Sequence, residues 1–179
     1  TRNASTSAIV ECLSGATVIV VGDTMLDRFV DGVVDRISPE APIPVFTVRR
    51  ETSMLGASGN VLRNLVALGG TAHLITVLGD DDAGGEIRRL IAEEAQTDAG
   101  VHGVPARRTS IKTRYVASGQ QMMRADRETV EEIPLDFQDR IVAQVEAEIP
   151  NAGALLLSDY GKGVLSDALL RRLIDTARV

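Results

Sequence analysis

The sequence predicts an α/β domain built on a parallel sheet, with a small second sheet attached to it. Three short apolar runs are typical of strands that helices cover on both faces, at residues 16–21, 72–78 and 154–157. Helical patterns separate these runs, and this alternation favours right-handed βαβ units. Two polar, hairpin-like stretches do not fit such a sheet, so we expect them to form the second sheet over one end of the first.

Each strand of the main sheet is expected to end in a polar turn. In chain order these turns are Gly22-Asp23, Gly79 with three aspartates, and Ser158-Asp159. A further short strand is expected near Val101. Ligands of open α/β sheets bind at the carboxyl ends of strands, so the turns are where a site is expected.

Four helices are expected from apolar residues at helical spacing. Gly69-Gly70 ends the first helix, and Asp80–Asp82 can cap the second. The expected ranges are 56–68, 83–95, 136–149 and 165–177.

The second sheet is expected from residues 29–50 and 109–126. The first segment contains prolines, which confine its two strands to edge or half-exposed positions and place a loop at Ser38–Pro42. The second segment is typical of a hairpin around Ser118-Gly119 that is polar on one side.

Composition limits the classes of function. The chain has 179 residues, 44% of them hydrophobic and 25% charged, which suits one globular domain with a substantial core. A net charge of −6 disfavours general nucleic-acid binding. The single cysteine, Cys12, excludes an intrachain disulfide and a Cys-based zinc cluster. No membrane span or signal peptide is recognised, so a soluble, cytoplasmic protein with no membrane partner is expected.

Several common signatures are absent. No phosphate-binding loop of the Gly-x-x-x-x-Gly-Lys-Ser/Thr type surrounds Lys162, and no Gly-x-Gly-x-x-Gly follows the first strand. His73 and His102 lack an accompanying ligand pattern and are expected to be ordinary surface or core residues. Asp80–Asp82 lack the spaced ligands of a calcium loop. No metal site is predicted.

Candidate binding residues follow the first strand and begin the first helix. Asp23 and Asp27 could accept hydrogen bonds from sugar hydroxyls, with turn and helix-capping roles equally open. Gly56 would let a ligand approach the backbone, and the Asn60 amide could bind a polyol. A helix start rich in small residues for packing is the alternative.

Four cations lie on or beside the second hairpin: Lys112, Arg114, Arg124 and Arg127. They would suit a phosphorylated substrate, although an ordinary solvated strand face is also open.

Asp159 and Lys162 follow the third buried strand. The first and the third buried strand are then both followed by charged residues at the same edge of the sheet. We therefore expect Asp159 and Lys162 to face the same crevice as Asp23 and Asp27. A glycine-rich turn with incidental charges is the alternative.

Six segments occur in a fixed order along the chain. They are Gly22-Asp-x-Met-Leu-Asp-Arg28, Asp35-Arg-Ile-Ser-Pro-Glu-Ala-Pro-x-Pro-Val45, Gly56-x-x-x-Asn60-Val61, Leu68-Gly, Gln120-Gln and Leu157-Ser-Asp-Tyr-x-Lys-Gly163. Taken together, these segments resemble the ribokinase-like (PfkB-type) carbohydrate kinases, and within that family the bacterial heptose 7-phosphate kinases. The resemblance covers nearly the whole chain, and Arg36–Pro42 is its most specific part.

The resemblance implies a three-layer α/β/α sheet with a small β lid used for homodimerisation. It implies ATP- and Mg²⁺-dependent phosphorylation of the anomeric hydroxyl of a heptose 7-phosphate, on the route to lipopolysaccharide core. The resemblance also implies which residues bind the substrate. Asp27 and Asn60 would bind sugar hydroxyls, with Asp23 and Gly56 beside them. Lys112 and Arg114 would bind the substrate phosphate, and Asp159 and Lys162 would lie at the boundary between sugar and phosphate.

The sequence departs from the family pattern in two ways. Ala57 and Ser58 stand where relatives have a second glycine and an alanine, and Leu62 stands where relatives have a small residue. The family's Gly-Ala-Gly-Asp segment, which carries the catalytic base, is also missing before Val179. We therefore expect residues 1–179 to be the N-terminal portion of one kinase domain, truncated before the ATP-binding half, inactive alone and without a catalytic base.

Two other functions remain open from the sequence. Another sugar or nucleoside kinase of the same family would share most of these motifs. A non-catalytic module for sugar-phosphate binding or dimerisation would share them without turnover.

Overall fold

The computed structural model describes residues 14–95 and 100–178, which form two four-stranded sheets. The main sheet has the order β5-β4-β1-β8, and all its pairs are parallel. Its strands are β1 (Thr17–Gly22), β4 (Thr71–Gly79), β5 (Gly100–Val104) and β8 (Ala154–Ser158). They confirm the strands expected from the apolar runs and the short strand near Val101.

The four expected helices are present. They are α2 (Ser58–Ala67), α3 (Asp82–Ala95), α4 (Leu135–Glu148) and α5 (Asp167–Thr176), and a 3₁₀ turn, η1 (Ile149–Asn151), follows α4. Helix α2 begins two residues later than expected, because strand β3 continues up to it. No helix in the described part of the chain has the length and apolar character needed to cross a membrane.

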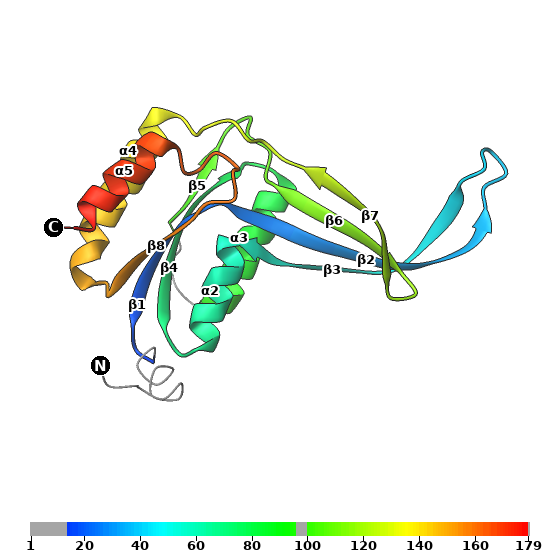
Figure 1. The fold of residues 1–179 in the computed structure, drawn as a ribbon, viewed down its shortest axis with the longest axis horizontal. Helices are drawn as coiled ribbons and strands as arrows, with labels where there is room; N and C mark the ends of the chain where they lie inside the picture. Colours follow the sequence, from blue (N-terminus) through cyan, green and yellow to red (C-terminus); the bar gives the residue numbers. More distant parts are fainter. Residues whose placement is uncertain (1–13, 96–99, 179) are drawn as a thin grey trace, which may run out of the picture.

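Alternate side chains of β1 enter two separate cores, which makes the main domain a three-layer α/β/α structure. Ile19 and Val21 face helices α4 and α5, whereas Val18 and Val20 face α2 and α3. Figure 1 shows helices on both faces of the main sheet. The helix residues that fill the two cores are Ile141, Val145, Leu169 and Leu173 on one face, and Leu62, Ile87 and Ile91 on the other.

The two hairpin-like stretches form the second sheet, which we call the lid. Its order is β3-β2-β6-β7, from strands β2 (Thr24–Ile37), β3 (Pro44–Ala57), β6 (Ile111–Ala117) and β7 (Gln120–Arg127). Strand β2 pairs antiparallel with β3 and parallel with β6. The lid extends from one end of the main sheet as a long arm (Figure 1).

The strands of the first lid segment are longer than the expected 29–50. Strand β2 begins at Thr24, directly after the main sheet, and β3 runs on to Ala57. Pro39 and Pro42 lie in the connecting loop and Pro44 begins β3. These prolines lie outside β2, and a proline removes a hydrogen-bond donor only at its own position. Strand β2 can therefore pair with β3 on one side and β6 on the other, inside the sheet, while β3 forms an edge.

Candidate functional site

The site lies where the chain leaves the main sheet for the lid. Strand β1 ends at Gly22, Asp23 follows, and β2 begins at Thr24. A Cβ atom on Gly22 would lie 2.1 Å from the carbonyl oxygen of Ser158, so this close approach of β1 to β8 requires glycine. Residues 159–164, here called the β8 loop, follow β8 and cross the end of β1.

Asp23 holds the β8 loop. Its carboxylate accepts hydrogen bonds from the backbone N–H groups of Tyr160 (2.8 Å), Lys162 (3.0 Å) and Val164 (3.1 Å). The residue is only 1% exposed. The structure therefore brings Asp23 and the β8 loop together, as the sequence suggested. It directs the carboxylate at protein backbone, so a direct contact with substrate stays a prediction.

Asp27 lies within strand β2, so it is neither a turn residue nor a helix cap. Its Oδ1 is 2.5 Å from Nη1 of Arg114 on strand β6, and its side chain is 20% exposed. A Cβ atom on Gly56 would lie 2.4 Å from Oδ2 of Asp27. Glycine at position 56 thus leaves room for the carboxylate to lie across the junction of lid and core.

The other predicted residues lie on three different elements: Asn60 in α2, Asp159 in the β8 loop and Lys112 in β6. Asn60 is exposed in the first turn of α2. Asp159 is exposed, and its Oδ1 accepts a hydrogen bond of 2.8 Å from the N–H of Gly161. Lys112 lies beside Asp27 in the pairing of β2 with β6. Their expected contacts with substrate stay predictions.

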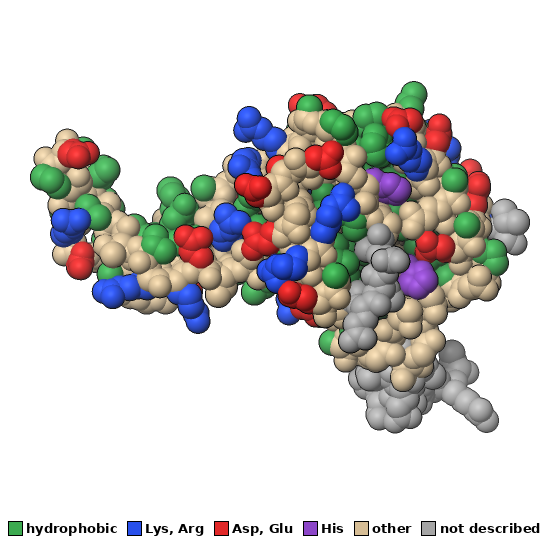
Figure 2. Space-filling model, turned by 180° about the vertical axis from the view of Figure 1, so that it is seen from behind, with side chains coloured by type: hydrophobic (Ala, Val, Ile, Leu, Met, Phe, Trp, Pro, Cys, Tyr) green, Lys and Arg blue, Asp and Glu red, His purple; other side chains and the backbone are tan. Residues whose placement is uncertain are grey.

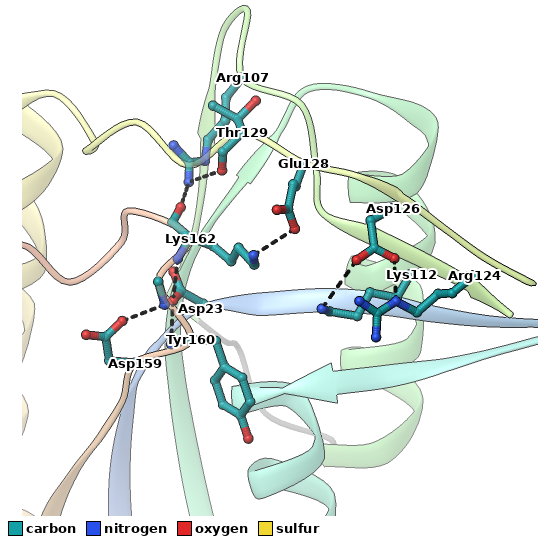
Figure 3. A network of polar contacts seen from close by, with 11 residues as sticks. Asp23, Arg107, Lys112, Arg124, Asp126, Glu128, Thr129, Asp159, Tyr160 and Lys162 are labelled. Atoms are coloured by element: carbon teal, nitrogen blue, oxygen red, sulfur yellow. Dashed lines mark hydrogen bonds and ion pairs between the residues drawn. The ribbon is translucent and has the colours of Figure 1, made fainter.

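Two lysines pair with acidic side chains at the end of the lid, one in β7 and one directly after it. Lys162 Nζ lies 2.7 Å from Glu128 Oε2, and Lys112 Nζ lies 3.7 Å from Asp126 Oδ2. Arg124 also pairs with Asp126, at 2.9 Å. Figure 3 shows each lysine joined to its carboxylate partner, Lys162 from the β8 loop and Lys112 from the lid. These are the only two lysines among the 19 basic residues of the sequence.

Sequence reasoning missed the roles of Asp126, Glu128 and Arg107. The alternation of Arg124, Asp126 and Glu128, which puts their side chains on one face of an extended segment, was the available signal for the two acids. Arg107 had none, because it lies in a loop after β5. Its half-buried guanidinium donates to the carbonyl oxygens of Thr129, Glu131 and Lys162. Burial lowers the pKa of Arg107, and the Asp23 and Glu131 carboxylates oppose that shift.

Asp81 joins the core to the start of β6. Its carboxylate accepts from the N–H of Gly84 (2.9 Å) in α3 and from the N–H of Thr109 (3.0 Å), which confirms the expected helix cap. Burial raises the pKa of Asp81, but hydrogen bonds from Thr109 and Gly84 outweigh it, and the net pKa is lowered. Within residues 14–95 and 100–178, no cluster of three or more His, Cys, Asp or Glu side chains could hold a metal ion.

A three-layer α/β/α sheet with a β lid over the carboxyl ends of its strands is the ribokinase-like fold. Residues 16–179 match the family described as pfkB family carbohydrate kinase, and the chain belongs to that family.

Relatives and solved structures agree with this assignment. The chain is 50% identical over 169 residues to the bifunctional protein HldE of Paramagnetospirillum magneticum, an alignment that covers 94% of this chain and 35% of that protein. The chain thus spans about a third of the length of the curated relatives it matches.

Two solved structures share the fold at low identity. The tetrameric inhibited form of phosphofructokinase-2 from Escherichia coli superposes with a TM-score of 0.62 at 24% identity, covering 92% of this chain and 51% of that one. Arabidopsis thaliana ribokinase complexed with ribose and ATP gives 0.57 at 16% identity, covering 91% and 50%.

Proposed function

We propose that this chain is the sugar-binding part of a kinase that uses ATP to phosphorylate the anomeric hydroxyl of D-glycero-D-manno-heptose 7-phosphate, for ADP-heptose and lipopolysaccharide core synthesis. One observation carries the proposal: a hydroxyl acceptor, Asp27, lies among the cations Arg114 and Lys112 at the carboxyl end of the main sheet. A sugar phosphate needs both chemistries, an acceptor of fixed direction for hydroxyls and positive charge for the phosphate.

The roles follow from the contacts of each side chain. Asp27, oriented by Arg114, accepts a hydrogen bond from a sugar hydroxyl. Asn60 and Asp159 supply further polar groups from α2 and the β8 loop. Lys112 and Lys162 neutralise the substrate phosphate, which competes with Asp126 and Glu128 for them; the 3.7 Å pair of Lys112 with Asp126 is loose enough to exchange partners.

The choice of heptose rests on the sequence and its relatives. The segment Arg36–Pro42 carries the most specific resemblance to heptose 7-phosphate kinases, and the 50% identity to bifunctional protein HldE supports the same subgroup. ATP and Mg²⁺ are the co-substrate and ion that the reaction requires. No described residue is assigned to either, and no catalytic base is assigned.

The test combines binding with turnover. We expect calorimetry to show heptose 7-phosphate binding to this chain, and a coupled assay to show ATP consumption only for the longer Paramagnetospirillum magneticum relative. Preference for a nucleoside or another sugar would favour a different kinase of the family. Binding without turnover in both proteins would favour a non-catalytic sugar-phosphate module.

We also propose that two copies of the chain associate through the lid. The outer lid exposes several large apolar side chains, with exposed fractions from 48% to 63% at Ile37, Ile43, Val48, Met122 and Met123. Figure 2 shows hydrophobic side chains along this arm. Large exposed apolar groups gathered on one element favour association.

Sedimentation velocity tests this association. We expect a dimer for the unaltered chain and a monomer for Ile43→Glu. Leu135→Glu, at a 73% exposed position on α4, is the matched control and should stay dimeric. A monomeric unaltered chain would contradict the proposal.

A further inference from the structure

Arg107 joins two segments that are far apart in the sequence. Its guanidinium donates to the carbonyl oxygens of Thr129 (3.4 Å) and Glu131 (3.0 Å), which lie between the lid and α4. It also donates to the carbonyl oxygen of Lys162 in the β8 loop. Figure 3 shows the guanidinium between Thr129 and Lys162. One side chain therefore holds the β8 loop against the segment by which the lid returns to the core.

The β8 loop is held on its other side by the carboxylate of Asp23, which accepts three of its backbone N–H groups. The loop also packs directly against the returning segment. Gly163 has a φ of +83°, and a Cβ atom there would lie 2.2 Å from the carbonyl oxygen of Glu131. The β8 loop is thus held by two charged side chains: the Asp23 carboxylate binds its N–H groups, and the Arg107 guanidinium binds the carbonyl oxygen of Lys162.

The side chain of Lys162 extends from the β8 loop toward the lid. Its Nζ pairs with Glu128 Oε2 at 2.7 Å, and its side chain is only 16% exposed. Glu128 directly follows the last residue of β7. The position of Lys162 therefore depends both on the loop that Arg107 holds and on the end of the lid.

We propose that Arg107 is a positioning residue for the site. It fixes the β8 loop to residues 128–132, and it thereby holds the Lys162 side chain beside the end of the lid, where Lys162 would bind the phosphate of the substrate. This inference rests on the proposed function for the substrate, but its structural part does not. The guanidinium of Arg107 donates to backbone carbonyl oxygens, one of them that of Lys162, so it acts on the site through Lys162. A guanidinium suits the task because its planar fork carries five donors, whereas a single amine could not reach three carbonyls in fixed directions.

The two lysines make the proposal directly testable in this chain. Reductive methylation with ¹³C-formaldehyde labels Lys112, Lys162 and the N-terminal amine, which gives very few resonances. Lys162 reports on the β8 loop, and Lys112, on strand β6, is the internal reference. Glu128→Gln identifies the Lys162 resonance by removing its ion-pair partner.

We expect Arg107→Met to move the Lys162 resonance toward the position it takes in Glu128→Gln, with the Lys112 resonance unchanged. Arg108→Met, at an exposed neighbouring position, should move neither resonance. An unchanged Lys162 resonance in Arg107→Met, or an equal shift of both lysines in a folded variant, would overturn the proposal. If Arg107→Met does not fold, Arg107→Gln is read by the same criteria.

Titration with heptose 7-phosphate tests the part that depends on the proposed function. Displacement of a positioning group by a fraction of an ångström is expected to weaken sugar-phosphate binding about tenfold in Arg107→Met, with Arg108→Met unchanged. Equal affinity in Arg107→Met and the unaltered chain would overturn the link from Arg107 to the substrate. If the unaltered chain does not bind the sugar phosphate, the proposed function fails, whereas the Lys162 resonance still decides whether Arg107 holds the loop.

Discussion

Arg114 and Asp27 form an ion pair of 2.5 Å although 87 positions separate them in the sequence. The parallel pairing of β2 with β6 brings them together on the lid. Arg114 also lies over the ring of Phe29, with 5.2 Å between its Cζ and the ring centroid, so its guanidinium is held from two sides. The carboxylate proposed to bind the sugar is therefore oriented before any ligand arrives.

Replacing Asp27 should affect ligand binding more than folding. In Asp27→Asn, the loss of a charged acceptor is expected to weaken heptose 7-phosphate binding at least about tenfold, since a charge-assisted hydrogen bond contributes about 1.5–3 kcal/mol. Calorimetry measures the affinity and urea unfolding measures the stability. Asp31→Asn, which removes a 3.3 Å pair with Arg50 further along β2, is the control and should retain binding. Equal losses in both variants would argue against a role for Asp27.

Asp23→Asn is expected to destabilise the fold strongly. The buried carboxylate accepts three backbone N–H groups, and an amide in its place presents a donor to at least one of them. A loss of about 3 kcal/mol in the free energy of unfolding is expected, as for a buried polar network broken on one side. Urea unfolding checks this, with Asp159→Asn, an exposed residue with one such contact, as the comparison. Similar losses at both positions would contradict the assignment.

Ala57→Gly should stabilise the protein. Ala57 has φ 55° and ψ −125°, a backbone conformation that glycine adopts readily and residues with a Cβ atom rarely adopt. Relief of this strain is expected to outweigh the entropy that glycine adds to the unfolded chain, for a net gain of about 1 kcal/mol. The midpoint of thermal unfolding measures it. Ala67→Gly at the end of α2 should lower stability, and a similar decrease in Ala57→Gly would refute the prediction.

Stability should fall in mild acid because of His102. Burial lowers the pKa of His102 below its ordinary 6.5; a hydrogen bond with Gln144 opposes this, and the charges of Arg140 and Arg88 add to it. The unfolded chain then binds more protons than the folded chain just below pH 6.5. The contribution of neutral His102 is therefore complete above pH 6.5 and is lost as the pH falls toward the lowered pKa.

Urea unfolding from pH 5 to pH 8 measures this dependence. We expect it to be weaker in His102→Gln and to persist in His73→Gln, which leaves the half-buried ring of His102 in place. An unchanged pH dependence in His102→Gln would show that other groups dominate.

Much of the main domain was predictable because its signals are local. Branched apolar runs indicated β1, β4 and β8, and apolar spacing indicated the four helices to within a few residues. The lid was harder to delimit. Strand β2 begins, and β3 ends, among buried residues next to the main domain. No turn or loop signal in the sequence separates Gly22 from β2 or Ala57 from α2. The prolines indicated an edge but could not show which strand occupied it.

For the candidate site, the sequence suggested residue types but not contacts. Asp159 and Lys162 were expected to face the same crevice as Asp23 and Asp27, and in the structure Asp23 holds the β8 loop that carries both. Arg107 and Glu128 carried no motif. A hydrogen bond to a backbone group leaves no pattern in side-chain identity, because any residue supplies the same N–H or carbonyl.

The sequence by itself determined the layers of the fold, since periodic burial of apolar side chains and glycine at tight turns are properties of neighbouring residues. Only the tertiary structure decided which charges meet. Asp23 binds backbone groups 137 to 141 positions away, and Lys162 reaches Glu128 only because β8 and the end of the lid come together. Such contacts depend on how the two sheets join, and that geometry arises from the packing of the whole chain.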